Sequence, residues 1–120
     1  MRVELQRDDD VKVVLDILFW KTAPGERRIV NGKELIDTTC QINIDGDTST
    51  VLRELTCAVA RQNPLDNYNK IVGKKIALAR AIANIAFLKP IPQICSINVR
   101  RRTSRQHIWN VFHQTFGRWN

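Results

Sequence analysis

Three lysines gather at the start of a segment that is predicted to form a helix from about residue 70 to residue 88. Lys70 is the first of them, and Lys74 and Lys75 follow one turn later. The first turn of a helix carries unpaired N–H groups and about half a positive charge. Ammonium groups beside such a turn strengthen its attraction for anions, so this segment is predicted to contain a phosphate-binding site.

The apolar residues of this helix are expected to share one face. At 100° per residue, the apolar arc contains Ile71, Val72, Ala79, Ile82, Ala83 and Ala86. The opposite arc contains Lys70, Gly73, Lys74, Arg80 and Asn84. Lys75 falls inside the apolar arc, and because lysine is rarely buried without a partner, its ammonium should either reach the helix edge or meet an anion. We include Arg80, on the arc of Lys70 and Lys74, in the predicted ligand-binding set.

Arg100, Arg101 and Arg102 form a second cationic group, directly before the last predicted helix. The guanidinium fork suits phosphate oxygens, and in an extended segment Arg100 and Arg102 would project to one side as a clamp. An exposed basic turn is the alternative. Asn98 could hydrogen-bond a base or a ribose, or could be an ordinary strand residue. Because both cationic groups precede or begin helices, we expect them to converge on one phosphorylated ligand.

Aromatic residues near the cationic groups could stack on a base, which contributes roughly 1–3 kcal/mol per base. Tyr68 and Trp119 are the available candidates. Trp109 is expected in the core instead, because it lies on the apolar stripe of the last helix.

Residues suited to catalysis are scarce. His107 and His113 lie six positions apart in one predicted helix and cannot point the same way, which disfavours a shared metal ion or an acid–base pair. The three aspartates at 8–10 fit a solvated turn better than a cation site. No nucleophile elbow, Walker loop or dinucleotide-binding glycine motif occurs. We therefore expect a binding protein without catalytic residues, metal or cofactor.

The first half of the chain predicts strands. Residues 2–7 alternate apolar and polar side chains. Residues 11–20 fit helical spacing as well as alternation, and their β-branched and aromatic content favours a strand. Asn31-Gly32 suits a type I′ turn between strands at 27–30 and 33–36.

Asp45-Gly46 predicts a second hairpin between residues 38–44 and 48–60. Cys40, Ile42 and Ile44 should share one face of its first strand. On the returning strand Cys57 and Val59 are among the residues that compete for the core, which suggests either a bulge or a strand buried on both faces near Leu55.

Two helices complete the predicted fold. Asp66 or Asn67 is expected to cap the first, and Thr103 or Ser104 the second. The second helix has an apolar stripe of Ile108, Trp109, Phe112 and Phe116 and ends at Gly117. The sequence thus predicts one α+β domain over residues 1–120, in which an antiparallel sheet from the N-terminal half is covered by two C-terminal helices.

The composition favours an anionic partner. The chain has 19 lysines and arginines against 12 acidic residues, a formal charge of +7. Cys40, Cys57 and Cys95 lack metal-ligand spacing and fit reduced, buried thiols. With no secretory signal pattern and no apolar stretch of about 20 residues, we expect a cytoplasmic protein without a membrane partner.

Three segments carry a resemblance to a known family. They are Asp66-Asn67-Tyr68-Asn69, the run from Gly73-Lys74-Lys75 to Ala79-Arg80-Ala81, and Ile108-Trp109. In these segments the C-terminal half resembles small phage proteins, including those that defeat the Thoeris defence system by sequestering its cyclic ADP-ribose-type signal. The resemblance implies a phage-encoded, oligomeric nucleotide sponge that acts in the host cytoplasm, with an antiparallel sheet followed by two helices.

Two other functions stay open from the sequence. The protein could be a small basic nucleic-acid-binding protein whose cations contact successive phosphates, so that its affinity falls steeply with salt. It could also mask a host enzyme by protein contacts alone, which would need no phosphate site.

Overall fold

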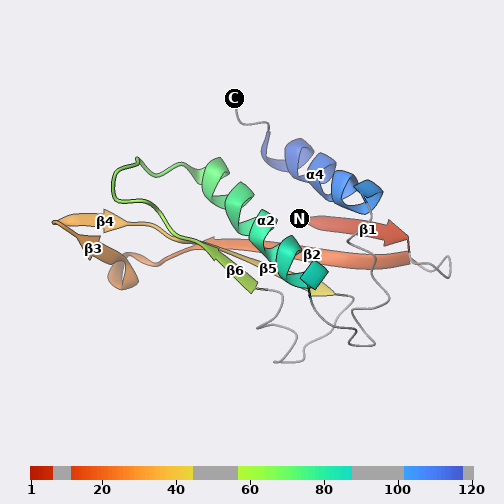
Figure 1. Ribbon diagram of the computed structural model, residues 1–120, viewed down its shortest axis with the longest axis horizontal. Coiled ribbons are helices and arrows are strands. Elements are labelled where there is room, and N and C mark those ends of the chain that lie inside the picture. Colours follow the sequence, from red (N-terminus) through yellow and green to blue (C-terminus); the bar gives the residue numbers. More distant parts are fainter. Residues whose placement is uncertain (7–11, 45–56, 88–101, 118–120) are drawn as a thin grey trace.

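The computed structural model describes residues 1–6, 12–44, 57–87 and 102–117, without the side chains at 6, 12, 13, 44, 85–87 and 102–104. A four-stranded antiparallel sheet and a small separate hairpin pack with two helices (Figure 1). The predicted α+β class is confirmed.

The four-stranded sheet has the order β1-β2-β5-β6. Its strands are β1 (Arg2–Gln6), β2 (Lys12–Lys21), β5 (Thr38–Ile44) and β6 (Cys57–Ala60). The strand prediction for 11–20 is confirmed, since β2 alternates between the two faces of the sheet. Leu15 and Ile17 are fully buried, whereas Leu18 and Trp20 are about half exposed.

The strands β5 and β6 pair antiparallel, with Gln41 opposite Cys57 and Cys40 opposite Ala58. Residues 45–56, including the predicted turn and bulge, lie outside the described residues. Of the competing core candidates, Val59 is exposed and Cys57 is partly exposed. Ala58 and Ala60 enter the core instead, because Ala58 lies opposite the buried Cys40.

The small hairpin joins β3 (Arg28–Val30) to β4 (Lys33–Leu35) after a short 3-10 helix, η1 (Pro24–Glu26). Asn31 has φ 51° and Gly32 has φ 79°. Two successive positive φ angles are what a type I′ turn requires, so this predicted turn is confirmed.

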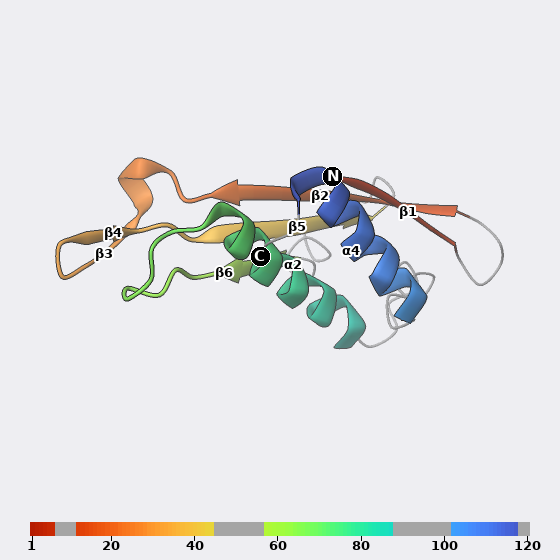
Figure 2. The ribbon, with the colours of Figure 1, turned by 90° about the horizontal axis from the view of Figure 1, so that it is seen from above.

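Helices α2 (Lys70–Phe87) and α4 (Arg102–Phe116) lie on the same face of the sheet (Figure 1). They run in opposite directions (Figure 2), so the start of α2 lies beside the end of α4. Gly117 ends α4 with φ 84°, and its N–H donates to the carbonyl oxygen of His113, as predicted for a glycine cap. Because α4 begins at Arg102, Thr103 and Ser104 lie within its first turn, and the prediction that they precede the helix is wrong.

The core lies between the sheet and the helices. It includes Val3, Leu5, Leu15, Ile17, Cys40, Ile42, Ala58, Ala60, Ala77, Leu78, Ala81, Ile82, Ile108 and Phe112. Trp109 and Phe116 are partly buried against it, which confirms the predicted stripe of α4. No helix in the described ranges is long and apolar enough to cross a bilayer.

The face of α2 that packs on the sheet differs in part from the predicted one. Ile82 is buried as predicted, but Ala77, Leu78 and Ala81 are buried with it, whereas Ala79 is exposed. The buried arc is therefore rotated toward the side that carries Lys74. On this face Gly73 lies against Thr38 of β5, and the larger apolar Ile76 is left 42% exposed.

Candidate functional site

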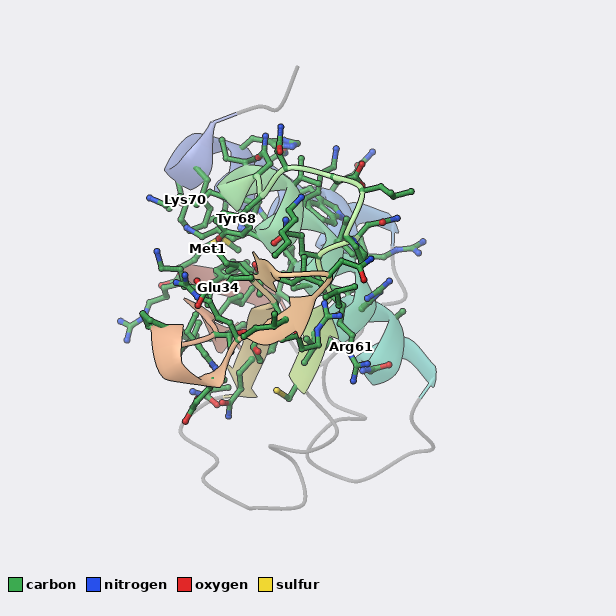
Figure 3. All side chains as sticks on the ribbon, turned by 90° about the vertical axis from the view of Figure 1, so that its left-hand side faces the viewer. Met1, Glu34, Arg61, Tyr68 and Lys70 are labelled. Carbon is green, nitrogen blue, oxygen red and sulfur yellow. The ribbon has the colours of Figure 1, made fainter. Side chains whose placement is uncertain are left out.

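A hollow of about 190 Å³ opens where the end of the sheet meets the start of α2. Its lining residues are Phe19, Trp20, Lys21, Thr38, Tyr68, Lys70 and Lys74. We call it the lysine hollow. Lys21 ends β2 and is paired directly opposite Thr38 of β5, while Lys70 and Lys74 come from the first turns of α2. Tyr68 and Lys70 are labelled at this end of the molecule in Figure 3.

Lys74 is partly buried because it lies on the side of α2 that faces the sheet and the end of α4. Its ammonium lies 4.1 Å from the ring centroid of Phe116 and 5.9 Å from that of Phe19. Phe19 and Phe116 are themselves in edge-to-face contact, with centroids 5.5 Å apart. Cation–π attraction to these two phenylalanine rings therefore holds the Lys74 ammonium at the edge of the hollow.

The lysines of the hollow repel one another. Lys70 and Lys74 are spaced i, i+4 on one helix, where like charges destabilise. Partial burial lowers the pKa of Lys74, and the charge of Lys70 lowers it further. The lining contains no carboxylate among the described residues. Since a bound anion would relieve both the repulsion and the desolvation, the charge distribution suits an anionic ligand.

The N-terminus of α2 is capped by its own sequence. The Asn69 side-chain oxygen accepts hydrogen bonds from the N–H groups of Ile71 at 3.0 Å and Val72 at 3.1 Å. Asn69 is thus the N-cap, and the prediction of Asp66 or Asn67 is wrong because the helix begins later than either allows. The two capped N–H groups are not free for phosphate, so an anion in the hollow would rely on lysine side chains and on the helix dipole.

Thr38 places a buried polar atom at the base of the hollow. The residue is 2% exposed, and its Oγ1 has no hydrogen-bond partner among the described residues. It lies under Gly73, where an added Cβ would come within 2.5 Å of that oxygen. An unsatisfied buried hydroxyl costs about 1–3 kcal/mol, so this threonine lowers the stability of the fold.

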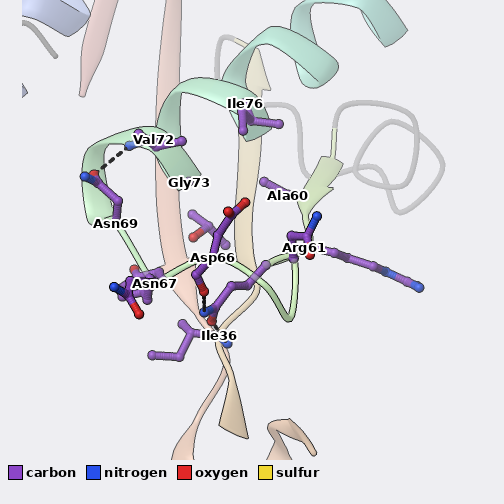
Figure 4. A pocket seen from close by; sticks show the side chains of 13 residues that line it. Ile36, Ala60, Arg61, Asp66, Asn67, Asn69, Val72, Gly73 and Ile76 are labelled. Carbon is purple, nitrogen blue, oxygen red and sulfur yellow. Dashed lines mark hydrogen bonds between the residues drawn. The ribbon is translucent and has the colours of Figure 1, made fainter. Parts of the chain in front are cut away.

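A second hollow of about 170 Å³ adjoins the first (Figure 4). Thr38 and Tyr68 line both hollows. Ile36, Val72 and Ile76 contribute apolar surface to the second one. We call it the loop hollow, because most of its polar lining comes from the loop at 61–69.

A hydrogen-bond network holds that loop against the sheet. The Gln62 side chain accepts from the N–H of Ile36 at 2.7 Å and donates to the carbonyl of Asp66 at 2.9 Å. The Asp37 carboxylate accepts from Arg28 at 2.6 and 2.9 Å and from the N–H of Gln62 at 3.2 Å. The hydrogen bond with Arg28 is the main cause that lowers the pKa of Asp37. The loop that carries Tyr68 is therefore anchored.

Of the predicted ligand-binding residues, Lys70, Lys74 and Tyr68 meet in the lysine hollow. Lys75 and Arg80 lie elsewhere on α2. Lys75 is exposed on another side of α2 than Lys74, so its predicted place in the apolar arc is wrong. Arg80 donates to the carbonyl of Val59 at 2.8 Å, at the β6 side of α2. It does not line the lysine hollow.

The remaining predicted residues belong to the second cationic group. Asn98 and Arg100 lie outside the described residues, and only the backbone of Arg102 is described. Arg102 begins α4, whereas Lys74 packs on Phe116 at its other end. These ends are about 20 Å apart at 1.5 Å per residue. The two helix starts therefore do not converge within one copy, because the helices are antiparallel (Figure 2).

Sequence reasoning missed Lys21 and Thr38. A signal was present, since Lys21 continues the alternation of Ile17 and Phe19 toward the helices. Recognising it required the pairing of β2 with β5, which the sequence did not supply.

No cluster of three potential metal ligands occurs among the described residues. Cys40 is buried, and this raises the pKa of its thiol to about 12, so the thiol stays protonated and unreactive near neutral pH. No family model, curated protein or solved structure matches this chain.

Proposed function

We propose that this protein binds a cyclic nucleotide or a related phosphorylated small molecule and holds it without changing it. In this proposal it acts as a phage anti-defence protein that sequesters an immune signal in the host cytoplasm. The observation that carries the binding proposal is the lysine hollow, where Lys21, Lys70 and Lys74 surround a concave space beside Tyr68. The anti-defence role comes from the resemblance of the C-terminal half.

The hollow supports binding of a compact ligand. Its cations come from two elements, and the partly buried Lys74 is held over aromatic rings. Concave sites with a few fixed polar groups are typical of small-molecule binding. The alternative, binding along a nucleic-acid backbone, would use a track of exposed cations, whereas Arg80 and Lys74 lie on different sides of α2.

A second copy of the chain is part of the proposal. A sponge must bind near nanomolar, about −12 kcal/mol, and at about −0.3 kcal/mol per heavy atom this requires nearly full contact with a dinucleotide-sized ligand. Hollows of about 190 and 170 Å³ cannot enclose such a molecule. We therefore place the complete site between copies in a homo-oligomer.

Calorimetric titration at about 150 mM salt tests the function. Cyclic ADP-ribose and cyclic dinucleotides are compared with single-stranded RNA and duplex DNA, and the ligand released by denaturation is checked by chromatography. Submicromolar binding of a nucleotide that is recovered intact supports the proposal. Tight polymer binding with no nucleotide binding would establish the nucleic-acid alternative, and a chemically altered ligand would show an enzyme.

A further inference from the structure

The two adjoining hollows differ in chemical character, and this difference suggests how one ligand would lie in them. Among the described residues, the lysine hollow gathers three cations, whereas the loop hollow combines apolar surface with side-chain amides and one carboxylate, that of Asp66. The one cation in the described lining of the loop hollow, Arg61, extends away from the other lining side chains (Figure 4). We propose that the loop hollow is a base-binding subsite that selects nucleotides whose base carries an exocyclic amino group. This inference rests on the proposed function, because it takes the phosphate to lie in the lysine hollow.

Asp66 supplies the selective group. Its side chain is directed toward α2 near Gly73 and Ile76 (Figure 4). Its backbone carbonyl receives hydrogen bonds from Gln62 and Lys33 at 2.9 and 3.0 Å, which fixes the residue in place. No hydrogen bond or ion pair within the described part of the chain occupies its carboxylate. A carboxylate only accepts hydrogen bonds, so it would bind an amino group and reject a carbonyl oxygen.

Apolar residues supply the surface on which a base would lie. Val72 and Ile76 line the hollow from α2, and Ile36 lines it from the segment that follows β4. Ile76 is 42% exposed although it is large and apolar. A planar base placed here would cover Ile76 and leave its polar edge toward Asp66, which is the arrangement expected of a small-molecule site.

The wall between the hollows is where the sugar of such a ligand would lie. Thr38 and Tyr68 border both spaces. Thr38 is buried, so the sugar would contact the partly exposed Tyr68. Each hollow alone is smaller than the roughly 300 Å³ at which small-molecule sites begin, whereas the two together exceed this size.

The inference is tested by calorimetry with three probes, AMP, IMP and ribose 5-phosphate, on the full chain. AMP carries an exocyclic amino group, IMP carries a carbonyl oxygen in its place on the same purine ring, and ribose 5-phosphate has no base. We expect AMP to bind about tenfold or more tightly than IMP, the effect of one charge-assisted hydrogen bond. In Asp66→Asn the ratio of the two affinities should fall at least fivefold. The matched control Asp16→Asn, at an exposed acid of β2, should keep the ratio.

A second pair of variants tests the apolar surface. Ile76→Ala should weaken AMP at least threefold and leave ribose 5-phosphate unchanged, whereas Ile29→Ala, at an exposed isoleucine of the small hairpin, should change neither. If ribose 5-phosphate binds through Lys74 and AMP binds no more tightly than it, the base subsite is overturned while phosphate binding stands. If none of the three probes binds, or if Lys74→Met leaves their binding unchanged, both proposals fail.

Discussion

Lys74 is the residue on which the proposed site depends most. Replacing it by methionine keeps an apolar stem over Phe116 and removes a partly buried charge. We expect Lys74→Met to lower nucleotide affinity about tenfold or more, since a charge-assisted hydrogen bond contributes about 1.5–3 kcal/mol. Its thermal stability should be equal to or above that of the wild type.

The matched control is Lys75→Met, one residue further along the same helix and exposed on another side. Calorimetric titration of both variants with the same nucleotide provides the comparison. Equal losses of affinity would mean that the helix attracts the ligand by net charge alone, and the lysine hollow would have no special role.

Gly73 is required because the helix approaches the sheet closely at Thr38. In Gly73→Ala the new Cβ would lie 2.5 Å from Thr38 Oγ1 and 3.2 Å from its Cβ. We expect a loss of about 1–3 kcal/mol in the free energy of unfolding, despite the higher helix propensity of alanine. In a Thr38→Ala background the loss should shrink by at least about 1 kcal/mol, because the hydroxyl is gone.

Urea denaturation of the two single variants and the double variant measures this coupling. Gly25→Ala is the matched control, since an added Cβ there meets nothing within 4 Å, and it should be neutral. Strict additivity of Gly73→Ala and Thr38→Ala would show that the two residues do not collide.

At the level of elements, the hairpin of β3 and β4 is connected to the site through Asp37. The pKa of Asp37 is below its ordinary value of 3.8, chiefly because Arg28 donates hydrogen bonds to it. Its contribution to stability is therefore present above about pH 4 and is lost as the pH falls through the folded-state pKa. We expect Asp37→Asn to be less stable than the wild type at pH 7, with a difference that shrinks toward pH 2.

Thermal unfolding of both proteins across that pH range provides the check. Asp16→Asn serves as the control, because its ion pair with Arg2 is largely exposed and should contribute little. A constant difference between wild type and Asp37→Asn from pH 7 to pH 2 would contradict the role given to the Asp37 carboxylate.

Elements with local signals were predictable from the sequence. The strand β2 was recognised by alternation and the Asn31-Gly32 turn by residues that tolerate positive φ. The buried face of α2 was not, because it depends on how closely the alanines and Gly73 approach Thr38. For the same reason the sequence did not predict that Lys74 is partly buried beside the lysine hollow while Lys75 is exposed. Two of the seven described residues that line the lysine hollow, Lys21 and Thr38, meet only through the pairing of β2 with β5.

At the scale of the whole molecule, the proposed ligand is larger than the two hollows of one copy can enclose. If copies complete the site together, saturating cyclic nucleotide should raise the sedimentation coefficient or stabilise an existing oligomer against dilution. Lys74→Met should abolish this response. A monomer that binds ligand tightly and sediments unchanged would contradict the shared site.

The antiparallel arrangement of α2 and α4 also limits the second cationic group. Arg102 begins α4 at the end far from Lys74, so the backbone start of α4 lies apart from the lysine hollow of the same copy. Under the proposed function, a second copy would bring another α4 start to the ligand. The sequence gives the positions of the cations along the chain. Which cations lie close together in space depends on the antiparallel directions of α2 and α4 (Figure 2), which the sequence alone did not predict.

The most direct test of the phosphate site is an NMR titration of the isotopically labelled protein with AMP and, separately, with inorganic pyrophosphate. We predict that pyrophosphate shifts the signals of Lys21, Lys70 and Lys74 and that AMP shifts these together with Tyr68. Shifts that cluster at Lys75 and Arg80, or none at the start of α2, would contradict the account.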